Sequence, residues 1–187
     1  LPKTDYATKL KLAKWSEKVG ALDIVLESGG EKPYKLVQPS AAANYSPLIS
    51  DMRKLLSHTH FAVCSKAMQV LSMLAEGVGE KLYPQLRPLL STLLQLSKDK
   101  KLTRQASCTL DSFFGNVLSF DHVLDEEDAL PENLDESKQK NALARATGLE
   151  FLSRCVARRE NAGNRGQLSA RNAKRIASLC TSKLDDS

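Results

Sequence analysis

The first candidate for chemistry is a cysteine that lies four residues after a histidine. Cys64 follows His60, and His58 precedes His60 by two residues. A cysteine nucleophile needs an orienting third group and an oxyanion hole, and the sequence offers neither. Two histidines that are two residues apart on a helix face different directions, so as metal ligands they lack partners. We therefore expect neither a nucleophile nor a metal site here.

Carboxylates form a contiguous run instead of a spaced pair. Residues 125–128 read Asp-Glu-Glu-Asp, whereas general acid–base catalysis needs carboxylates in different environments. The sequence also contains no GxGxxG, GxxxxGK[ST], GxSxG or HExxH motif. We therefore expect a charged loop at 125–128. For the whole chain we expect no enzyme activity, no catalytic or metal-ligating residue, no cofactor and no small-molecule substrate.

The four cysteines are spread singly along the chain, without a CxxC pair. They are Cys64, Cys108, Cys155 and Cys180. This spacing supports neither a zinc site nor a disulfide framework. We expect all four to be small core-filling residues of a protein in a reducing compartment.

The elements that must position any site are predicted to be helices, because apolar residues recur at helical spacing along the chain. Apolar residues recur on one helical face within 46–56, 63–78, 86–94 and 106–117, and helices are also expected at 3–13, 16–27, 142–159 and 167–184. Successive helices pair into hairpins, the first pair being joined at Lys14 and Trp15. Corresponding turns, at Trp15, Phe61, Lys101 and near Lys140, are about 40 to 47 residues apart, which is typical of HEAT or armadillo repeats.

The fold prediction is therefore all-α, an α-solenoid of HEAT-like helical hairpin repeats. We expect a single, monomeric domain over 1–187. Its approximate repeats are 1–28, 45–79, 82–118, 120–159 and an incomplete 167–187. The segment 28–44 is expected to connect two repeats and to carry a short turn around Leu36 and Val37. The acidic segment 121–136 fits a short helix or a solvated loop equally well.

Composition indicates a folded soluble chain. The 187 residues are 42% hydrophobic and 26% charged, with 27 Lys and Arg against 22 Asp and Glu. These values exclude a chain disordered throughout and a histone-like duplex binder. Charge is segregated, however: 119–137 hold eight acids and no Lys or Arg, whereas 138–183 hold eleven Lys or Arg and two acids.

We expect no membrane-spanning helix, because the leucine-rich run 86–96 is interrupted by Arg87, Pro88 and Gln95. The start at Leu1, without Met, predicts an excised fragment.

The predicted turns carry an unusual set of exposed residue types. They read Lys14-Trp15, His58-Thr59-His60-Phe61, Lys98-Asp99-Lys100-Lys101 and Lys138-Gln139-Lys140-Asn141. Trp15, the single tryptophan, lies between Lys14 and Lys18. It could cap the end of the solenoid, or it could anchor an interface with an acidic protein.

Three stretches resemble a known family. Residues 14–22, KWSEKVGAL, resemble the opening of TOG domains in the Dis/TOG (ch-TOG/Stu/Minispindles-like) microtubule polymerase family. Residues 68–79, MQVLSMLAEGVG, followed by Glu80 and Lys81, resemble the second helix of the second repeat, and SKDKK at 97–101 resembles the third turn. The resemblance covers residues 3 to about 118 well and the remainder more loosely.

The resemblance implies a non-catalytic domain that binds the αβ-tubulin heterodimer and promotes microtubule plus-end growth and spindle organisation. The resemblance also implies a location in the cytoplasm and cytoskeleton, on microtubules, the spindle and the centrosome or spindle pole. Because such domains have about six repeats, it also implies that the chain stops before the arginine of the fifth turn. The implied tubulin-binding residues are Trp15, Lys18, His60, Phe61, Lys98, Lys100, Lys101, Lys138 and Lys140.

Two alternatives stay open. One is a CLASP-type TOG domain, or a TOG domain that has lost tubulin affinity. The other is a HEAT scaffold that binds an acidic protein or, as a less favoured partner, nucleic acid. That scaffold would use the basic C-terminal third, with Arg154, Arg158, Arg159, Arg165, Arg171, Lys174 and Arg175.

Overall fold

The computed structural model describes residues 5–41, 43–125 and 129–184, and the regular elements in these ranges are helices. The longer helices are α2 (Trp15–Ser28), α3 (Ser46–Leu55), α4 (Phe61–Val78), α6 (Leu90–Leu96), α7 (Thr103–Asn116), α10 (Ala142–Ala157) and α11 (Ala170–Leu184). The shorter ones are α1 (Tyr6–Lys9), α5 (Tyr83–Leu86), α8 (Phe120–Val123) and α9 (Ala129–Leu134). Three 3-10 segments, η1 (Gly79–Leu82), η2 (Arg87–Leu89) and η3 (Arg159–Gly166), join them.

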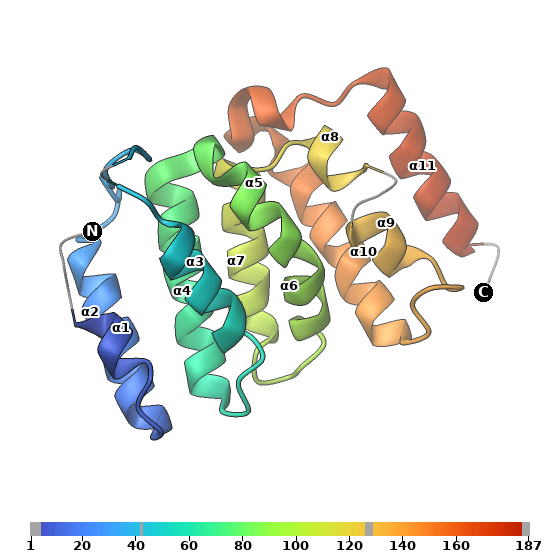
Figure 1. The fold of residues 1–187 in the computed structure, drawn as a ribbon. Coiled ribbons are helices and arrows are strands. Elements are labelled where there is room, and N and C mark those ends of the chain that lie inside the picture. The colour runs from blue at the N-terminus through green and yellow to red at the C-terminus, as the bar shows by residue number, and fades with distance from the viewer. Residues whose placement is uncertain (1–4, 42, 126–128, 185–187) are drawn as a thin grey trace.

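The helices form two layers that extend along the molecule in chain order (Figure 1). In one layer, α2 packs against α4, α4 against α7, and α7 against α10. In the other layer, α1, α3, α6 and α9 each pack against the helix that completes their hairpin. Stacked hairpins bury a continuous core between neighbours, which is the architecture of a helical solenoid. The prediction of an all-α solenoid of HEAT-like hairpins is confirmed.

α4 and α7 form the centre of the core. The apolar face of α4 is fully buried, and α7 contributes Ala106, Leu110 and Phe113 to the same layer. Each leucine-sized side chain buried in this way stabilises the fold by about 1.5–3 kcal/mol. Two hydroxyls lie between the helices: Ser72 Oγ and Thr109 Oγ1 are 3.0 Å apart, and both lie near the Met68 carbonyl oxygen, at 3.1 and 3.2 Å. These hydrogen bonds satisfy polar groups that would otherwise destabilise the interface.

The first helix is shorter than the predicted 3–13. α1 ends at Lys9, and the chain forms a turn over 10–14 before α2 begins at Trp15. Lys18 of α2 donates from Nζ to the carbonyl oxygen of Leu10, so a side chain instead of a helical amide satisfies this carbonyl. Trp15 therefore lies in the first turn of α2 and not in the loop.

The first half of the third repeat is segmented by prolines. Pro84 and Pro88 lie in α5 and η2, where their missing amide hydrogens and rings favour helix starts and 3-10 turns over a regular α-helix. The apolar stripe is nevertheless buried as predicted, and it comprises Leu86, Leu89, Leu90, Leu93 and Leu94.

The segment from 29 to 41 crosses the C-terminal end of α4 as a strap that is extended over 34–39. No turn forms at Leu36 and Val37, contrary to the sequence expectation. Leu36 packs instead so closely over α4 that a Cβ placed on Gly77 would lie 2.6 Å from its Cγ. The Tyr45 hydroxyl donates to the Val37 carbonyl oxygen at 2.7 Å and holds the strap in this extended form.

Within its described residues, the acidic segment has the short helical structure that was one of the two expected forms: two short helices, α8 and α9, each with buried apolar residues. Ser119 and His122 form a capping box at the start of α8, and the His122 ring stacks on Tyr83 at 4.0 Å between centroids. Residues 126–128 of the predicted charged loop lie outside the described residues. Of α9, Leu130 and Leu134 are buried.

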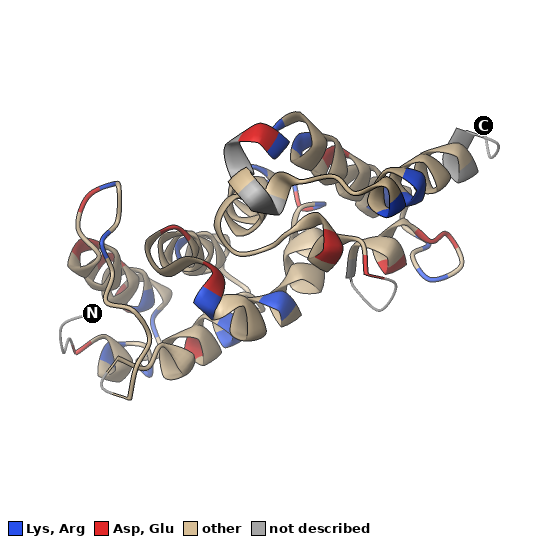
Figure 2. Cartoon of the chain, turned by 90° about the horizontal axis from the view of Figure 1, so that it is seen from above, with Lys and Arg blue, Asp and Glu red and all other residues tan. Residues whose placement is uncertain are grey.

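Folding mixes the charges that the sequence keeps apart. Arg154 and Arg158 of the basic third both pair with Asp111 of α7, at 2.8 and 2.6 Å. Asn172 of α11 donates to Asp121 of α8 at 2.8 Å. Figure 2 shows basic and acidic residues interspersed along the solenoid. The segregation in sequence therefore does not produce one acidic half and one basic half in space.

One helical run resembles a membrane span by length and composition. The stretch Phe61–Leu96 reaches a mean hydropathy of 1.2 over an 18-residue window, of which 56% is buried in the solenoid. Gly79, with a φ of 78°, ends α4 within it. Core helices of helical proteins meet the same criteria, and α4 packs against α2, α3 and α7.

The expectation that all four cysteines fill the core is wrong for two of them. Cys64 and Cys155 are buried, but Cys108 and Cys180 are exposed. Cys108 lies on α7 two residues after Ala106, so helical geometry turns it away from the apolar face. Burial raises the pKa of the Cys64 and Cys155 thiols, and Cys64 Sγ donates to the His58 carbonyl oxygen at 3.0 Å.

Maleimide labelling of the folded chain at neutral pH is expected to divide the cysteines into two pairs. Cys108 and Cys180 should react readily. Cys64 and Cys155 should react roughly 100-fold more slowly, because they need local opening and a thiolate that burial disfavours. Peptide mapping by mass spectrometry measures each site. Equal labelling of all four cysteines without denaturant would contradict this packing.

Candidate binding surface

The turns within the four hairpins lie along one edge of the solenoid (Figure 1, lower edge). They comprise residues 10–14, 56–60, 97–102 and 135–141. Because each hairpin repeats the same helix–turn–helix path, equivalent turns are brought side by side although they are far apart in sequence. This edge therefore presents the residue types noted in the sequence as one surface.

Aromatic stacking joins the first two turns, and a cation–π contact adds the third. The Trp15 ring lies parallel to the His60 ring, with centroids 3.9 Å apart and planes within 7°. His60 in turn stacks on Phe61 at 5.4 Å and 15°. The ammonium group of Lys101 lies 5.5 Å from the centroid of the Phe61 ring, within the range of a cation–π interaction. Three repeats thus contribute to one aromatic and cationic cluster.

His60 links this cluster to the backbone of α4. It is the N-cap residue of that helix, and its Nδ1 accepts a hydrogen bond from the Ala62 amide at 3.3 Å. Its own amide donates to Nδ1 of His58 at 3.0 Å. The ring is therefore fixed from the helix end while its face supports Trp15. The sequence alone does not indicate that His60 caps this helix.

Two substitutions at His60 should separate its capping from its stacking. His60→Asn keeps a good N-cap but removes the ring, so it should leave the unfolding free energy within about 0.5 kcal/mol and shift Trp15 fluorescence to longer wavelength. His60→Phe keeps a ring but removes the cap, so it should cost about 0.5–2 kcal/mol and preserve the emission. Because Trp15 is the single tryptophan, its emission reports this site alone. Identical behaviour of the two variants would contradict the assignment.

The third turn is held in a defined shape by Asp99. Its Oδ1 accepts the Lys101 amide at 2.8 Å, and its carbonyl oxygen accepts the Thr103 amide at 2.7 Å. Lys98 donates to Gln95 Oε1 at 2.9 Å and is half-buried, whereas Lys100 and Lys101 are exposed. Lys18 is another of the lysines that the resemblance implies as tubulin-binding. Its ammonium group donates to the Leu10 carbonyl oxygen and so braces the first turn.

The fourth turn has an ordered backbone and exposed cations. Asn141 caps α10 by accepting the Ala144 amide at 3.1 Å, and Arg145 donates to the Gln139 carbonyl oxygen at 2.8 Å. Lys138 pairs with Glu132 at 3.0 Å, and this hydrogen bond raises the Lys138 pKa. Lys140 is exposed. These contacts all lie within the fourth hairpin, whereas the aromatic cluster is built by the first three turns, so along the edge the fourth turn is a separate group.

Exposed large apolar side chains are concentrated at this edge. Among the described residues six are exposed, and four of them flank the turns: Leu12, Trp15, Phe61 and Leu143, at 42–52% exposure. The other two, Val37 and Leu168, lie elsewhere. Leu12 and Leu143 were not predicted, although each is an apolar residue beside a predicted turn. We call the edge the turn ridge, comprising Leu12, Trp15, His60, Phe61, Lys98, Lys100, Lys101, Lys138, Lys140 and Leu143.

The turn ridge has the chemistry of a binding surface. It offers exposed aromatic and aliphatic side chains beside cations, on turns that hydrogen bonds hold in place, and preorganisation of this kind lowers the entropic cost of association. The basic C-terminal residues are less concentrated: Arg154 and Arg158 pair with Asp111, whereas Arg171 and Lys174 are exposed on α11. The side chain of Arg165 lies outside the described residues.

Comparison with known proteins places this geometry among known folds. No protein-family model matches the sequence. Over 130 residues, 67% of this chain, it is 23% identical to Centrosomal protein 224 of Dictyostelium discoideum, and it spans 6% of the length of that protein.

Solved structures of similar fold include three with TM-scores above 0.5. A chain from microtubule polymerases with Tumor Overexpressed Gene (TOG) domain arrays matches with a TM-score of 0.64 and 20% identity, over 81% of this chain and 30% of its own. The chain has the fold of a TOG domain. The MAST/Orbit N-terminal domain matches at 0.67 and 15% identity, over 94% of this chain and 80% of its own. A chain from a structure of microtubule plus-end tracking by XMAP215, CLIP-170 and EB1 matches at 0.58 and 14%, over 96% and 90%.

The TOG fold agrees with the resemblance that the sequence motifs indicate. Trp15 begins the second helix of the first hairpin, and the lysines of residues 97–101 lie in the third turn. The prediction of a TOG-type solenoid of HEAT-like repeats is therefore confirmed for the fold. The turn ridge is the surface of the TOG fold on which exposed apolar residues and lysines coincide.

Proposed function

We propose that this TOG domain binds the αβ-tubulin heterodimer through the turn ridge, without catalysis. The observation that carries the proposal is the stack of Trp15, His60 and Phe61, in which Trp15 and Phe61 are exposed and Lys101 lies over the Phe61 ring. Large aromatic side chains with cations nearby are the typical anchors of protein interfaces. The structures of similar fold, which concern tubulin recruitment and microtubule plus-end tracking, support this choice of partner.

In the proposed complex, the ridge acts as a preformed template. The aromatic cluster packs against an apolar patch of one tubulin subunit, and Lys98, Lys100, Lys101, Lys138 and Lys140 face acidic surface further along the dimer. Electrostatic attraction of these lysines increases the association rate, and the desolvated aromatics slow dissociation. No bond is made or broken in this function.

Promotion of microtubule plus-end growth and spindle organisation follows from such binding if the domain is one of several in an array. A linked domain raises the local concentration of tubulin at the growing end. A ridge that fits curved tubulin better than straight tubulin binds the free, curved subunit more tightly. When the subunit straightens after incorporation, the affinity falls and the domain is released. We place the protein in the cytoplasm and cytoskeleton, on microtubules, the spindle and the centrosome or spindle pole. The similarity to Centrosomal protein 224 supports the last of these.

Size-exclusion chromatography with purified tubulin tests the proposal. The 187-residue chain should elute together with αβ-tubulin at low salt and separate from it as salt increases, because exposed charge pairs are screened. Retention of both proteins at their separate elution volumes, at micromolar concentrations and low salt, would contradict the proposal. A chain that instead elutes with nucleic acid and not with tubulin would favour the scaffold alternative.

A further inference from the structure

A groove lies in the layer formed by α2, α4, α7 and the end of α10, away from the turn ridge. Its volume is about 690 Å³, within the range of roughly 300–1,000 Å³ that is usual for ligand sites. The strap forms one wall through Lys32 and Tyr34, and Arg158 lies at the other side. None of the turn-ridge residues lines it. The groove is therefore a second surface, independent of the proposed tubulin contact.

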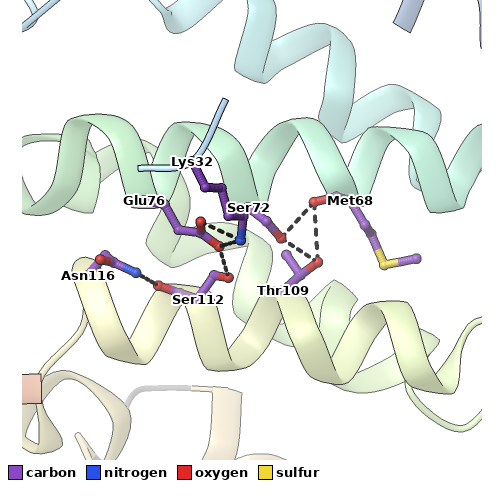
Figure 3. Close-up of polar contacts among 7 residues, drawn as sticks. All are labelled: Lys32, Met68, Ser72, Glu76, Thr109, Ser112 and Asn116. Atoms are coloured by element: carbon purple, nitrogen blue, oxygen red, sulfur yellow. Dashed lines mark hydrogen bonds and ion pairs between the residues drawn. The ribbon is translucent and has the colours of Figure 1, made fainter. Parts of the chain in front are cut away.

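The floor of the groove is a hydrogen-bonded layer on α4 and α7 (Figure 3). Glu76 Oε1 accepts from Ser112 Oγ at 2.9 Å, and Asn116 Nδ2 donates to the Ser112 carbonyl oxygen at 2.9 Å. Gln69 and Gln105 face each other at 3.5 Å, the long limit for a hydrogen bond. Amide side chains offer donors and acceptors together, which matches the N–H and C=O groups of an extended peptide backbone.

The charges of the groove are arranged by depth, with carboxylates below and cations above. Glu76 and Asp111 are only 22% and 14% exposed, whereas Lys32 and Arg158, which neutralise them, are 65% and 57% exposed. Asp111 also pairs with Arg154, which does not line the groove. Two cations thus face two carboxylates in the lining, and the two cations are the more exposed groups, which a ligand meets first. The Glu76 hydrogen bond raises the pKa of Lys32, so its ammonium stays charged at neutral pH.

We propose that this groove binds an extended acidic peptide. Its backbone lies along the amides of Gln69, Gln105 and Asn116, and its carboxylates reach Lys32 and Arg158. A single strand of nucleic acid fits less well, because such sites combine several cations with aromatic stacking platforms, and Tyr34 is the single aromatic among the lining residues.

Cysteine labelling provides a position-specific test. Cys108 is exposed and lines the groove, whereas Cys180 is exposed on α11 and does not line it. A deca-glutamate peptide should slow maleimide labelling of Cys108 and leave Cys180 unchanged in the same sample. Deca-lysine and a glycine–serine peptide of equal length should protect neither site.

Substitutions at Lys32 and Arg158 then test the two exposed cations of the groove. In a fluorescence-anisotropy titration with labelled deca-glutamate, the double variant Lys32→Gln/Arg158→Gln should bind about tenfold more weakly. The reason is that each exposed ion pair with the peptide contributes up to about fivefold in affinity. The control Lys54→Gln/Arg171→Gln removes the same charge from exposed positions on α3 and α11, and it should bind like the unmodified chain. Trp15→Ala should also leave peptide binding unchanged, so that failure of the tubulin proposal does not affect this test.

Several outcomes would overturn the groove assignment. They are equal protection of Cys108 and Cys180, equal loss of affinity in both double variants, absence of binding at millimolar peptide, and tighter binding of oligo-deoxythymidine than of deca-glutamate. Circular dichroism and thermal melting of every variant show that the solenoid is intact, so a loss of binding reports on the groove itself.

Discussion

Replacing Trp15 with alanine is expected to weaken binding of tubulin by about 30- to 1,000-fold, which corresponds to about 2–4 kcal/mol for truncation of an interface anchor. The indole is 47% exposed and rests on the His60 ring. It is therefore available to a partner and already held in one orientation. Since its loss creates no large cavity, the melting temperature should change little. Isothermal titration calorimetry or fluorescence anisotropy with labelled tubulin gives the affinity.

The matched control is Val37→Ala. Val37 is a large apolar residue that is 61% exposed on the strap, away from the turns. If exposure of any apolar group were sufficient, both substitutions would weaken binding to a similar degree. Equal affinity of Trp15→Ala and the unmodified chain would remove Trp15 from the interface. A loss with Val37→Ala alone would place the interface on the strap.

Replacing Phe113 with alanine should have the largest effect on stability. Phe113 is fully buried in α7, which packs against α4, α6 and α10. Loss of its ring leaves a cavity between two repeats and is expected to cost about 3–5 kcal/mol of unfolding free energy. For a domain of this size the melting temperature should fall by roughly 6–20 °C. Differential scanning calorimetry and urea denaturation measure both quantities.

Phe61→Ala provides the same chemical change at an exposed position. The Phe61 side chain is 49% exposed at the start of α4, so its truncation should cost less than about 1 kcal/mol. It should, however, weaken tubulin binding. The two phenylalanines should thus show opposite profiles, one affecting stability and the other binding. A Phe61→Ala variant as unstable as Phe113→Ala would contradict the assignment of Phe61 to the surface.

The sequence predicts the hairpin architecture well because apolar spacing determines which helical face is buried. The stripe of α4 and the leucines of 86–94 are both buried as the period requires. Helix ends are less predictable, since they depend on tertiary contacts. α1 ends early because Lys18 reaches the Leu10 carbonyl, and such a contact between a side chain and a distant backbone group has no periodic signal.

The turn ridge is partly predictable for the same reason. Trp15, Phe61 and the lysines stand out by residue type and by recurrence at the turns, but the contact of Trp15 with His60 joins residues 45 positions apart. Leu143 and Leu12 look like core residues in sequence because leucine is usually buried. Only the structure shows that Leu12, in the first turn, and Leu143, in the first turn of α10, face outward. The pairing of Arg154 and Arg158 with Asp111 is likewise invisible in a count of charges.

The most direct test of the central claim is hydroxyl-radical footprinting of the chain with and without αβ-tubulin. The exposed apolar side chains serve as probes in one sample: Leu12, Trp15, Phe61 and Leu143 on the turn ridge, and Val37 and Leu168 elsewhere. If the ridge binds tubulin, oxidation of Trp15 and Phe61, with Leu12 and Leu143, slows in the complex while Val37 and Leu168 oxidise at an unchanged rate. Unchanged oxidation of Trp15 and Phe61 in a sample where tubulin is bound, or protection confined to Val37 and Leu168, would contradict it.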